Sequence, residues 1–551
     1  MARARNWIHR LASGLGVAAA VVATTVAVAP AVPAAPAAPA AQDAAAGQDA
    51  GTLGLPLTQW AVGGQNIHNT RSNPFETTIS PANANKLALK WSLETAGDTT
   101  ATPAVVGGAV YFPDWGGYFY KVDAKTGKLI WKHKISEYNG VEGAVSRTAP
   151  IVSGDTVYIG DQPPGKPANG AHLMAIDTAT GNLRWITRVH PHPVAALTGA
   201  GVLHNGVIYQ GVSSREEPLS TLPGYVCCTF RGAVVAVEAR TGKILWTTYT
   251  IPDNGGVPGG YAGGSVFGTT PVVDPIRRTI YVGTGNNYIL PAEVKRCQEA
   301  GGTPEQCLSP DNHMDSILAL DMATGRIKWA QGERRFDDWN AGCLPGYPSH
   351  NCPDNNGPDY GFAAGPQLFW TRGADGRIRQ VLGAGEKSGD YWLLNPDDGS
   401  VIWRKATGPG GIHGGIEWGT ATDGQRVYIA QANTDRTPWT LPDGRTVTSG
   451  NFSAVDAATG KVVWQIPDPA GGVLLGAVTV ANGVFYAGSE KGNMYAIDAR
   501  TGKILFDYVG EGSSVAGPAV VNGTVYWSNG KTSFGEGHNG NTFYAFSLGG
   551  R

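Results

Sequence analysis

The sequence carries little net charge and has no long apolar run beyond its N-terminal segment. The 551-residue chain has a formal net charge of −2, which gives no electrostatic case for a nucleic-acid or anionic-membrane partner. No stretch after the N-terminal segment is long and apolar enough to cross a bilayer. The chain also lacks a Cys-x-x-Cys-His sequence, so covalently attached haem is not expected. These absences point away from nucleic-acid-binding, membrane-spanning and haem-carrying proteins.

The N-terminus reads as a secretory signal. Arg3, Arg5 and Arg10 precede an apolar run from Leu15 to about Val28, and Ala-x-Ala cleavage sites follow in an Ala/Pro-rich tract. A membrane anchor is the alternative, but the run is short and Ala-rich. We therefore predict a signal peptide and spacer over residues 1–45, an exported protein, and no transmembrane segment after the signal is removed.

The cysteine spacing agrees with export. Of the six cysteines, Cys297 and Cys307 share one polar loop, and Cys343 and Cys352 share another. Both pairs are natural disulfides in an oxidising compartment. The adjacent Cys227 and Cys228 either form a strained disulfide or remain two free thiols, and the compartment favours the disulfide.

A twelve-residue pattern organises the chain. It reads Tyr120-Lys-Val-Asp-Ala-Lys-Thr-Gly-Lys-Leu-Ile-Trp131 in its first copy. Its copies occupy residues 120–131, 174–185, 235–246, 318–329, 392–403, 453–464 and 495–506. A repeat of this kind indicates a solenoid, a propeller or an array.

Each copy predicts two strands joined by a turn. Apolar and polar residues alternate before the Asp, as in a half-buried strand. The Asp can accept hydrogen bonds from the following backbone N–H groups, and the Gly tolerates a positive φ. The terminal Trp suggests a wedge against a neighbouring unit. Another strand pair precedes most copies, so the unit is a four-stranded antiparallel blade, and the 78 Gly and 36 Pro fit such turn-rich structure.

The two ends of the chain complete the ring. Residues 516–527 and 542–548 supply three strands without a Trp strand, whereas residues 86–91 supply a Trp strand without a blade. We therefore predict an all-β fold over residues 57–551, an eight-bladed β-propeller with tryptophan-docking repeats, closed by an N-terminal strand. A seven-bladed ring with a loose end is the alternative.

Insertions fall in the middle of the ring. The interval between landmark tryptophans is longest between Trp185 and Trp403 and shorter at both ends. Insertions in propellers map to loops on one face, often the binding face. We expect residues from about 210 to 420 to roof a site.

With these features, the chain resembles the pyrroloquinoline quinone (PQQ)-dependent alcohol dehydrogenases, and most closely their polyvinyl alcohol dehydrogenase branch. The segments that carry the resemblance are Gln65-Asn-Ile-His-Asn-Thr-Arg-Ser-Asn73, Cys227-Cys-Thr-Phe-Arg-Gly232, Gly283-Thr-Gly-Asn-Asn-Tyr288 and Gly414-Gly-Ile-Glu-Trp-Gly-Thr-Ala-Thr-Asp-Gly424. The resemblance runs from about residue 57 to the end. It implies an oxidoreductase that binds PQQ and a metal and passes electrons to a cytochrome c-type acceptor.

The resemblance implies a set of cofactor-binding residues. Arg147 matches an arginine that meets a cofactor carboxylate, and Lys387 matches a cation beside the quinone oxygens. The other matches are Thr198 and Ser213 as hydrogen-bond donors, Asn433 as a contact, Phe267 as one stacking face and Cys227 with Cys228 as the other. For any one of these residues alone, a solvated surface position is the ordinary alternative.

The implied metal site uses hard oxygen ligands. Glu216 matches the carboxylate ligand, with Glu217 as a competitor, and Asn286 matches the amide ligand. Asn340, at the position of the family's usual base, is included among the predicted metal ligands. Calcium favours such oxygen donors. A lanthanide is not excluded, although Gly342 stands where lanthanide-using relatives carry an extra carboxylate.

The catalytic base departs from the family pattern. The family signature ending in Trp-Asp appears here as Phe336-Asp-Asp-Trp-Asn340, and an amide cannot act as a base. We predict Asp338 as the base, with Asp359 as a second candidate and Lys387 stabilising the reduced cofactor oxygens. The alternatives to a dehydrogenase of secondary alcohols are a quinoprotein with a changed substrate and a non-catalytic scaffold or binding propeller.

Overall fold

The computed structural model describes residues 59–551, except 165–167, 269, 347–348 and 532–536. The predicted signal peptide and spacer, residues 1–45, lie outside the described residues. Within the described part, no helix combines the length and apolar character that a membrane crossing requires.

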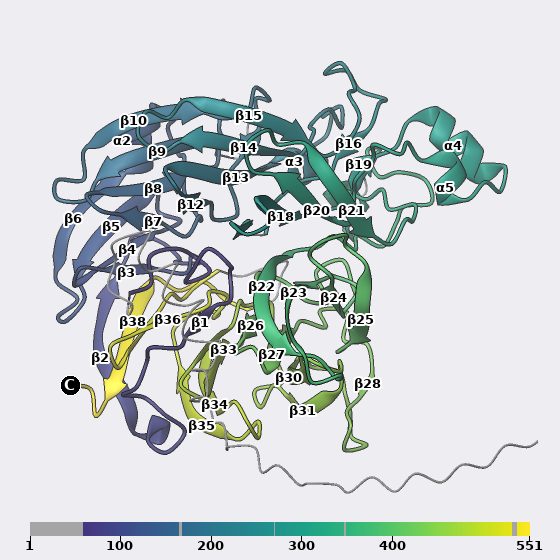
Figure 1. Cartoon of the computed structure of the whole chain (residues 1–551). Coiled ribbons are helices and arrows are strands. Elements are labelled where there is room, and N and C mark those ends of the chain that lie inside the picture. Colours follow the sequence, from purple (N-terminus) through teal and green to yellow (C-terminus); the bar gives the residue numbers. More distant parts are fainter. Residues whose placement is uncertain (1–58, 165–167, 269, 347–348, 532–536) are drawn as a thin grey trace, which may run out of the picture. The chain divides into compact units, whose positions relative to one another are not determined.

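Eight antiparallel sheets follow one another around a ring in the described residues (Figure 1). Blade 1 comprises β3 (Ala104–Val106), β4 (Ala109–Pro113), β5 (Tyr118–Asp123) and β6 (Leu129–Lys134). Blade 2 comprises β7 (Ile151–Ser153), β8 (Thr156–Gly160), β9 (His172–Asp177) and β10 (Leu183–Arg188). Blade 3 comprises β12 (Val202–His204), β13 (Val207–Ser214), β14 (Ala233–Glu238) and β15 (Ile244–Tyr249), with β11 (Ala195–Ala196) also paired to β13. Blade 4 comprises β17 (Val272–Asp274), β18 (Thr279–Gly283), β20 (Ser316–Asp321) and β21 (Ile327–Gly332).

The second half of the ring has the same plan. Blade 5 comprises β22 (Ala364–Arg372), β23 (Ile378–Gly385), β24 (Asp390–Leu394) and β25 (Val401–Ala406). Blade 6 comprises β26 (Ala421–Thr422), β27 (Arg426–Gln431), β30 (Asn451–Asp456) and β31 (Val462–Pro467). Blade 7 comprises β32 (Thr479–Ala481), β33 (Val484–Gly488), β34 (Asn493–Asp498) and β35 (Ile504–Val509). Blade 8 joins β36 (Ala519–Val521), β37 (Thr524–Trp527) and β38 (Thr542–Leu548) to β2 (Leu87–Glu94).

Blade 8 confirms the predicted closure of the ring. Strand β2 pairs antiparallel with β38, from Leu87 opposite Leu548 to Glu94 opposite Thr542. The eight-bladed prediction is therefore confirmed, and the seven-bladed alternative is wrong. Pairing the two ends of the chain also removes the open sheet edges that a linear array would expose.

The repeated tryptophan is a wedge between blades, as predicted. In five copies, and in Trp91 of the closing strand, the indole N–H donates to a backbone carbonyl of the next blade: Trp91 to Ala124, Trp131 to Thr178, Trp185 to Ala239, Trp246 to Met322, Trp403 to Ala457 and Trp464 to Ala499. The turn glycine of that next blade lies against the indole ring of the tryptophan. At Gly460 an added Cβ would be 2.9 Å from Trp403 Cδ2. The turn Asp acts as predicted too, since Asp123 accepts hydrogen bonds from the Lys125 and Thr126 N–H groups at 3.1 and 2.8 Å.

Gly460→Ala is expected to destabilise the ring more than Gly444→Ala. Both glycines have a positive φ, +70° and +86°, but nothing lies within 4 Å of a Cβ at Gly444. Both variants place an alanine in left-handed backbone, which destabilises each of them. Only Gly460→Ala also forces a methyl group against the Trp403 ring, which lowers the free energy of unfolding by about a further 1–3 kcal/mol. Urea unfolding checks the difference. Equal losses in the two variants would contradict the wedge role of Trp403.

A segment before β2, which we call the belt (residues 60–73), runs around one face of the ring. It makes backbone or side-chain hydrogen bonds to the first strand of seven of the eight blades: Trp60 with Val105, Ala61 with Val152, Ile67 with Val273, His68 with Leu368, Thr70 with Thr422, Arg71 with Val480 and Asn73 with Val520. At its end, β1 (Ser72–Asn73) pairs parallel with β32. The sequence predicted only a polar lead-in here. The belt holds the inner strands of distant blades in register.

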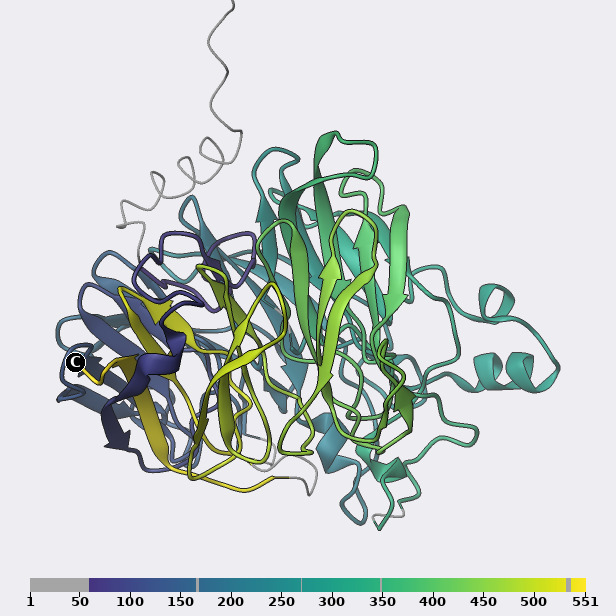
Figure 2. The same ribbon diagram turned by 90° about the horizontal axis from the view of Figure 1, so that it is seen from below.

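The insertions leave the ring on its other side. In Figure 2 the purple belt lies on the upper face, whereas α3 (Glu216–Leu219) lies on the lower face. Further inserted elements are α4 (Ala292–Glu299), α5 (Pro304–Cys307), η2 (Ala341–Cys343), β16 (Ala262–Gly263) and β19 (Asn287–Ile289). The α4–α5 pair projects outward from the ring, so this insertion does not roof the axis as expected. The remaining short elements are η1 (Ala84–Lys86), α2 (Ile135–Asn139), β28 (Trp439–Thr440) and β29 (Thr446–Val447).

All six cysteines form the disulfides expected from the sequence. The Cα atoms are 5.6 Å apart in Cys297–Cys307 and 4.8 Å apart in Cys343–Cys352. Cys227 and Cys228 are also disulfide-bonded, so the free-thiol alternative is wrong.

Candidate active site

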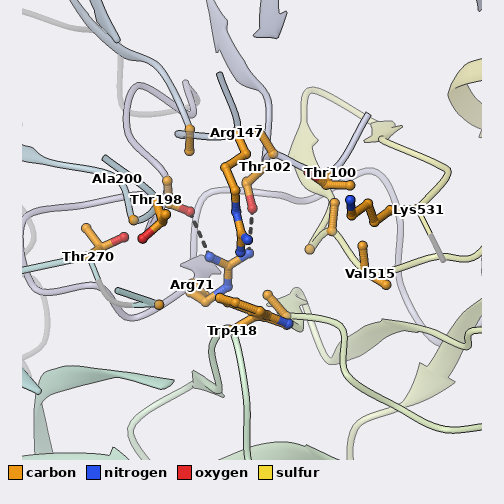
Figure 3. Close-up of a pocket in the computed structure, with 18 of the residues that line it drawn as sticks. Arg71, Thr100, Thr102, Arg147, Thr198, Ala200, Thr270, Trp418, Val515 and Lys531 are labelled. Carbon is orange, nitrogen blue, oxygen red and sulfur yellow. Dashed lines mark hydrogen bonds between the residues drawn. The ribbon is translucent and has the colours of Figure 1, made fainter. Parts of the chain in front are cut away.

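An internal cavity of about 300 Å³, which we call the axial chamber, lies between the belt and the loops that lead into the blades (Figure 3). Its lining includes Arg71 from the belt and three other polar or aromatic side chains that precede first strands, Arg147, Thr198 and Trp418. Lys531 adds another cation. None of its described lining residues is Asp or Glu. The axial chamber therefore favours an anionic ligand.

Arg71 fixes the belt side of the axial chamber. Its guanidinium donates to the Val478 and Gly63 carbonyls at 2.8 and 3.0 Å and to Thr102 Oγ1 at 2.9 Å. Burial lowers the pKa of Arg71 to about 10, so the group stays charged at neutral pH. Three hydrogen bonds to three parts of the chain make Arg71 an anchor of the belt as well as a source of positive potential.

Arg147 is the cation best placed to meet a ligand. Its guanidinium lies 4.3 Å from the centre of the Trp418 ring, a cation–π contact. Burial and the nearby Arg215 lower the pKa of Arg147 to about 10, against the opposing effect of Glu417. No acceptor for its N–H groups is found among the described residues. Arg147 is half-buried, so its N–H groups are open to an acceptor that a ligand supplies.

Two aromatic rings meet beside Arg147. The rings of Phe267 and Trp418 are edge to face, with centroids 6.2 Å apart and an interplanar angle of 88°. The Thr198 hydroxyl donates to the Phe267 carbonyl at 2.5 Å. Thr198 follows β11, and Ser213 lies on β13 opposite Ala196, so both predicted donors come from blade 3. The structure thus brings Arg147, Thr198 and Phe267 together and adds Trp418.

A second cluster, the Lys387 cluster, consists of Lys387, Glu217, Asp359 and Glu417. Lys387 Nζ is 2.5 Å from Asp359 Oδ2, and both side chains are buried. Burial acts to lower the pKa of Lys387, but Asp359, Glu417 and Glu217 outweigh it and the pKa is raised. Burial raises the pKa of Glu217 and Asp359, although Lys387 lowers each. Three carboxylates around one ammonium leave an excess of negative charge, which a bound cation would neutralise.

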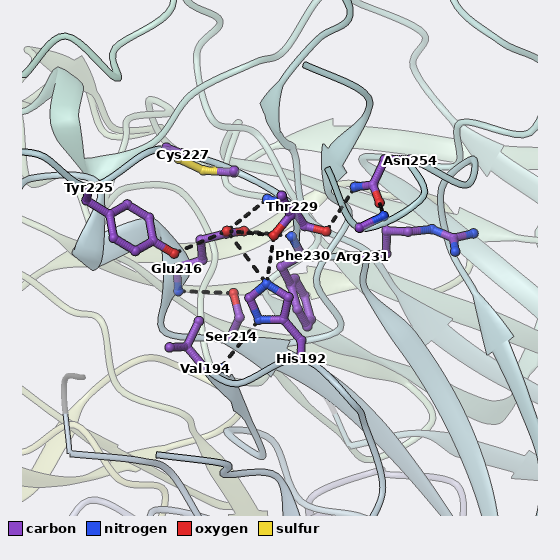
Figure 4. Close-up of polar contacts among 12 residues, drawn as sticks. His192, Val194, Ser214, Glu216, Tyr225, Cys227, Thr229, Phe230, Arg231 and Asn254 are labelled. Carbon is purple, nitrogen blue, oxygen red and sulfur yellow. Dashed lines mark hydrogen bonds and ion pairs between the residues drawn. A yellow bond between two sulfur atoms is a disulfide. The ribbon is translucent and has the colours of Figure 1, made fainter. Parts of the chain in front are cut away.

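Glu216 holds the loop that carries Cys227 and Cys228 (Figure 4). Its Oε2 accepts from the Phe230 N–H at 2.7 Å, and its Oε1 accepts from the Thr229 N–H at 2.8 Å and the Tyr225 hydroxyl at 3.2 Å. Burial raises the pKa of Glu216, while these hydrogen bonds lower it. The Glu216 carboxylate is therefore occupied by protein donors on both sides of the disulfide.

Glu216→Gln is expected to loosen this loop. An amide nitrogen would face N–H donors that now meet a carboxylate, so one buried donor loses its acceptor, at a cost of about 1–3 kcal/mol. The measurement is the rate at which a phosphine reduces Cys227–Cys228 relative to Cys297–Cys307. The exposed Glu305→Gln on α5 is the control. An unchanged reduction rate would contradict the assignment.

The predicted metal ligands Asn286 and Asn340 differ in their surroundings. Asn286 Nδ2 donates to the Asn287 and Trp339 carbonyls, both at 2.8 Å, and no described residue donates to its Oδ1. Asn340 Nδ2 donates to the Tyr288 and Asn351 carbonyls, and its Oδ1 accepts from the Gly342 N–H at 3.0 Å. Asn286 keeps a free oxygen for a cation, whereas the Asn340 amide is engaged at both ends. The prediction of Asn340 as a ligand is not supported.

Two further predicted residues point elsewhere. Asp338 Oδ2 is 2.8 Å from Lys295 Nζ on α4. Burial raises the pKa of Asp338 to about 6, and Lys295 opposes the shift. Asn433 Nδ2 donates to the Thr437 carbonyl at 2.9 Å, and its Oδ1 accepts from the Thr437 N–H at 2.9 Å. Asp338 is thus paired with the α4 insertion, and Asn433 is hydrogen-bonded beside the β28–β29 hairpin. Neither belongs to the Lys387 cluster.

Comparison with known proteins places this chain in a family. A family model described as "Outer membrane protein assembly factor BamB" matches residues 76–331 and 388–533. The polyvinylalcohol dehydrogenase of Sphingopyxis sp. (strain 113P3) is 31% identical over 532 residues, covering 86% of this chain and 74% of that protein. The chain belongs to the PQQ-dependent, or quinoprotein, alcohol dehydrogenase family.

Other members of the quinoprotein family agree. A polyvinylalcohol dehydrogenase of Pseudomonas sp. is 28% identical over 545 residues, covering 90% of this chain and 77% of that protein. The solved structure of quinohemoprotein alcohol dehydrogenase ADHIIG from Pseudomonas putida HK5 matches 92% of this chain and 82% of its own, with a TM-score of 0.69 and 20% identity. That structure supports the propeller fold.

Sequence reasoning missed four side chains of this quinoprotein site. Glu417 and Trp418 lie in a glycine-rich segment that carried the family resemblance, but neither was given a role. Arg71 also lies in a segment that carried the resemblance and was given no role, and Lys531 lies in the last blade, where no pattern linked it to the site. Only closure of the ring brings these distant loops to one axis.

Proposed function

We propose that this quinoprotein is an exported enzyme that oxidises secondary alcohols, polyvinyl alcohol among them. Because the sequence has no haem-attachment motif, electrons would leave to a separate cytochrome c-type acceptor. The names of the relatives support an alcohol as substrate. The observation that carries the proposal is Arg147, a half-buried guanidinium without an acceptor among the described residues, beside an aromatic face in a chamber free of described carboxylates.

The residues present fit PQQ, which carries three carboxylates. Arg147 would bind one carboxylate as a charge-assisted pair, and the positive potential of Arg71 and Lys531 would favour the others. Phe267 or Trp418 would stack on one face of the ring system, and Cys227–Cys228 is proposed for the other. When bound, PQQ supplies the acceptor for the hydride that leaves the alcohol carbon.

The residues also fit a calcium ion that completes its coordination with cofactor oxygens. Among the described residues no group of three or more His, Cys, Asp or Glu side chains could hold a metal alone. The Asn286 Oδ1 is free, and the Lys387 cluster carries excess carboxylate charge. We propose Asn286 and Glu217 as protein ligands, and Glu216 as the residue that holds the disulfide loop. A lanthanide in place of calcium stays open.

Within this arrangement each residue has a distinct task. Lys387, kept charged by three carboxylates, would stabilise negative charge that develops on an adjacent oxygen. Asp359 would hold the Lys387 ammonium in position through the 2.5 Å contact. A carboxylate of the Lys387 cluster would accept the hydroxyl proton of the alcohol.

Reconstitution tests the proposed function. The purified chain, mixed with PQQ and CaCl₂, is assayed by dye reduction with polyvinyl alcohol and with a short secondary alcohol. We expect turnover that requires both PQQ and CaCl₂. Turnover with the short alcohol alone would exclude the polymer. PQQ binding without turnover on either alcohol would indicate a different substrate, and no binding would contradict the proposal.

A further inference from the structure

Four carboxylates, three of them buried and one half-buried, compete for the role left open by Asn340. They are Glu217, Asp338, Asp359 and Glu417, and each has a raised pKa caused first by burial. A base must have a carboxylate oxygen free to take the hydroxyl proton and must lie where the alcohol meets the hydride acceptor. The contacts of each carboxylate decide between them.

Three of the four carboxylates are engaged by a lysine or by the proposed metal ion. Asp338 is paired with Lys295 at 2.8 Å and faces the α4 insertion. Asp359 is paired with Lys387 at 2.5 Å, so its proton affinity is tied to the lysine. Glu217 is the only one of the proposed metal ligands that carries a charge, and a cation bound there would keep it ionised. That leaves Glu417.

Glu417 is buried, with 4% of its surface exposed, and its carboxylate makes no hydrogen bond or ion pair with a described residue, although its backbone carbonyl accepts from the Gly419 N–H at 2.6 Å. Its loop is held against Lys387, because the Ile416 N–H donates to the Glu386 carbonyl at 3.1 Å and the Lys387 carbonyl lies directly against Gly415, where an added Cβ would clash with it. The next residue, Trp418, lines the axial chamber beneath Arg147. Glu417 therefore stands where the Lys387 cluster meets the axial chamber.

We propose that Glu417 is the catalytic base of the alcohol oxidation, an inference that rests on the proposed function. The O–H bond of the alcohol breaks and its proton passes to the Glu417 carboxylate. The C–H bond breaks with its electron pair, which leaves as hydride to PQQ. The alcohol loses two electrons and becomes a ketone, and PQQ gains them.

The charges around Glu417 suit this task. Burial raises its pKa to about 7, while Lys387 and Arg147 lower it and Glu217 raises it. Asp359 acts on the same cluster through Lys387, and His413 stays neutral because burial and Lys387 lower its pKa. A base with a pKa near the working pH combines a useful ionised fraction with proton affinity. Because the ionised form is the active one, the rate should rise as the pH increases through this range.

The test compares wild type and Glu417→Gln, both reconstituted with PQQ and CaCl₂, with a short secondary alcohol as substrate. We expect the maximal rate of Glu417→Gln to fall by about 10²- to 10⁴-fold, the usual contribution of a general base. Its PQQ affinity, followed by tryptophan fluorescence, should stay within a few-fold of wild type, and the rise of rate with pH should be lost. Glu417→Asp should keep part of the rate and the rise with pH. The exposed Glu142→Gln is the control.

Each outcome decides the proposal. A Glu417→Gln variant that keeps the wild-type rate and pH profile overturns it. So does a rate loss that is fully accounted for by weaker PQQ binding, which would make Glu417 a positioning residue. A comparable loss in Asp338→Asn with none in Glu417→Gln would reinstate Asp338. If wild type shows no PQQ-dependent oxidation, the proposed function itself fails, and the proposal fails with it. If Glu417→Gln does not fold, the rate and pH profile of Glu417→Asp decide by the same criteria.

Discussion

Replacing Arg147 by alanine is expected to weaken PQQ binding by about 10- to 100-fold. A hydrogen-bonded pair between charged groups contributes about 1.5–3 kcal/mol, and each 1.4 kcal/mol is a tenfold change in affinity. Arg147 is suited to such a pair because its guanidinium already lies on Trp418, 4.3 Å from the ring centre, and has no acceptor among the described residues. The measurement is an equilibrium titration of the CaCl₂-loaded protein with PQQ.

Two variants control the Arg147 result. Arg147→Lys keeps the charge but loses the planar fork, so its affinity should fall between wild type and Arg147→Ala. Arg445→Ala removes an exposed arginine whose partner is Asp443 on the β28–β29 hairpin, and it should bind PQQ like wild type. Wild-type affinity in Arg147→Ala would contradict the assignment of the axial chamber to the cofactor.

Replacing Glu217 by glutamine is expected to raise the CaCl₂ concentration needed for half-maximal turnover by at least about tenfold, since even supporting residues of metal sites contribute 10- to 100-fold to affinity. The amide removes the only charge among the proposed protein ligands. The same change at Glu216 serves as the comparison, because the Glu216 carboxylate accepts from Thr229, Phe230 and Tyr225. Calcium dependence of dye reduction at saturating PQQ measures both variants.

Glu217→Gln and Glu216→Gln are expected to have different effects, so the comparison distinguishes the two assignments of the metal ligand. If Glu217 is the ligand, Glu217→Gln shifts the calcium dependence, whereas Glu216→Gln exposes Cys227–Cys228 to reduction. If Glu216 is the ligand, as the family pattern predicts, Glu216→Gln alone shifts the calcium dependence. That second result would mean that a bound metal draws Glu216 away from the disulfide loop.

The fold was predictable because the local structure of each repeat can be inferred from that repeat's own residues. The turn Asp, the turn Gly and the terminal Trp appear in copies far apart, and each docking contact joins one copy to the next, as Trp403 joins Gly460. Closure was predictable because residues 86–91 lacked a blade and residues 542–548 lacked a Trp strand. The path of the belt was not predictable, because its contacts are mostly backbone hydrogen bonds that no side-chain pattern reports.

The site was only partly predictable, because family positions fix the backbone and not the direction of a side chain. Arg147 and Thr198 line the axial chamber, Phe267 packs against its Trp418, and Lys387 lies in the Lys387 cluster. Asp338 was predicted as the substitute for the base missing at Asn340, but the α4 insertion supplies Lys295, which pairs with it. Glu216 and Glu217 are neighbours in α3 and face different partners, a distinction that depends on one helical step.

Direct binding of PQQ tests the central claim most plainly. The purified full chain, with CaCl₂ present, is titrated with PQQ while tryptophan fluorescence and PQQ absorbance are followed together. The account predicts saturable binding of one PQQ per chain, with quenching of tryptophan emission because Trp418 lies in the wall of the axial chamber. Absence of saturable binding, or binding that Arg147→Ala leaves unchanged, would contradict it.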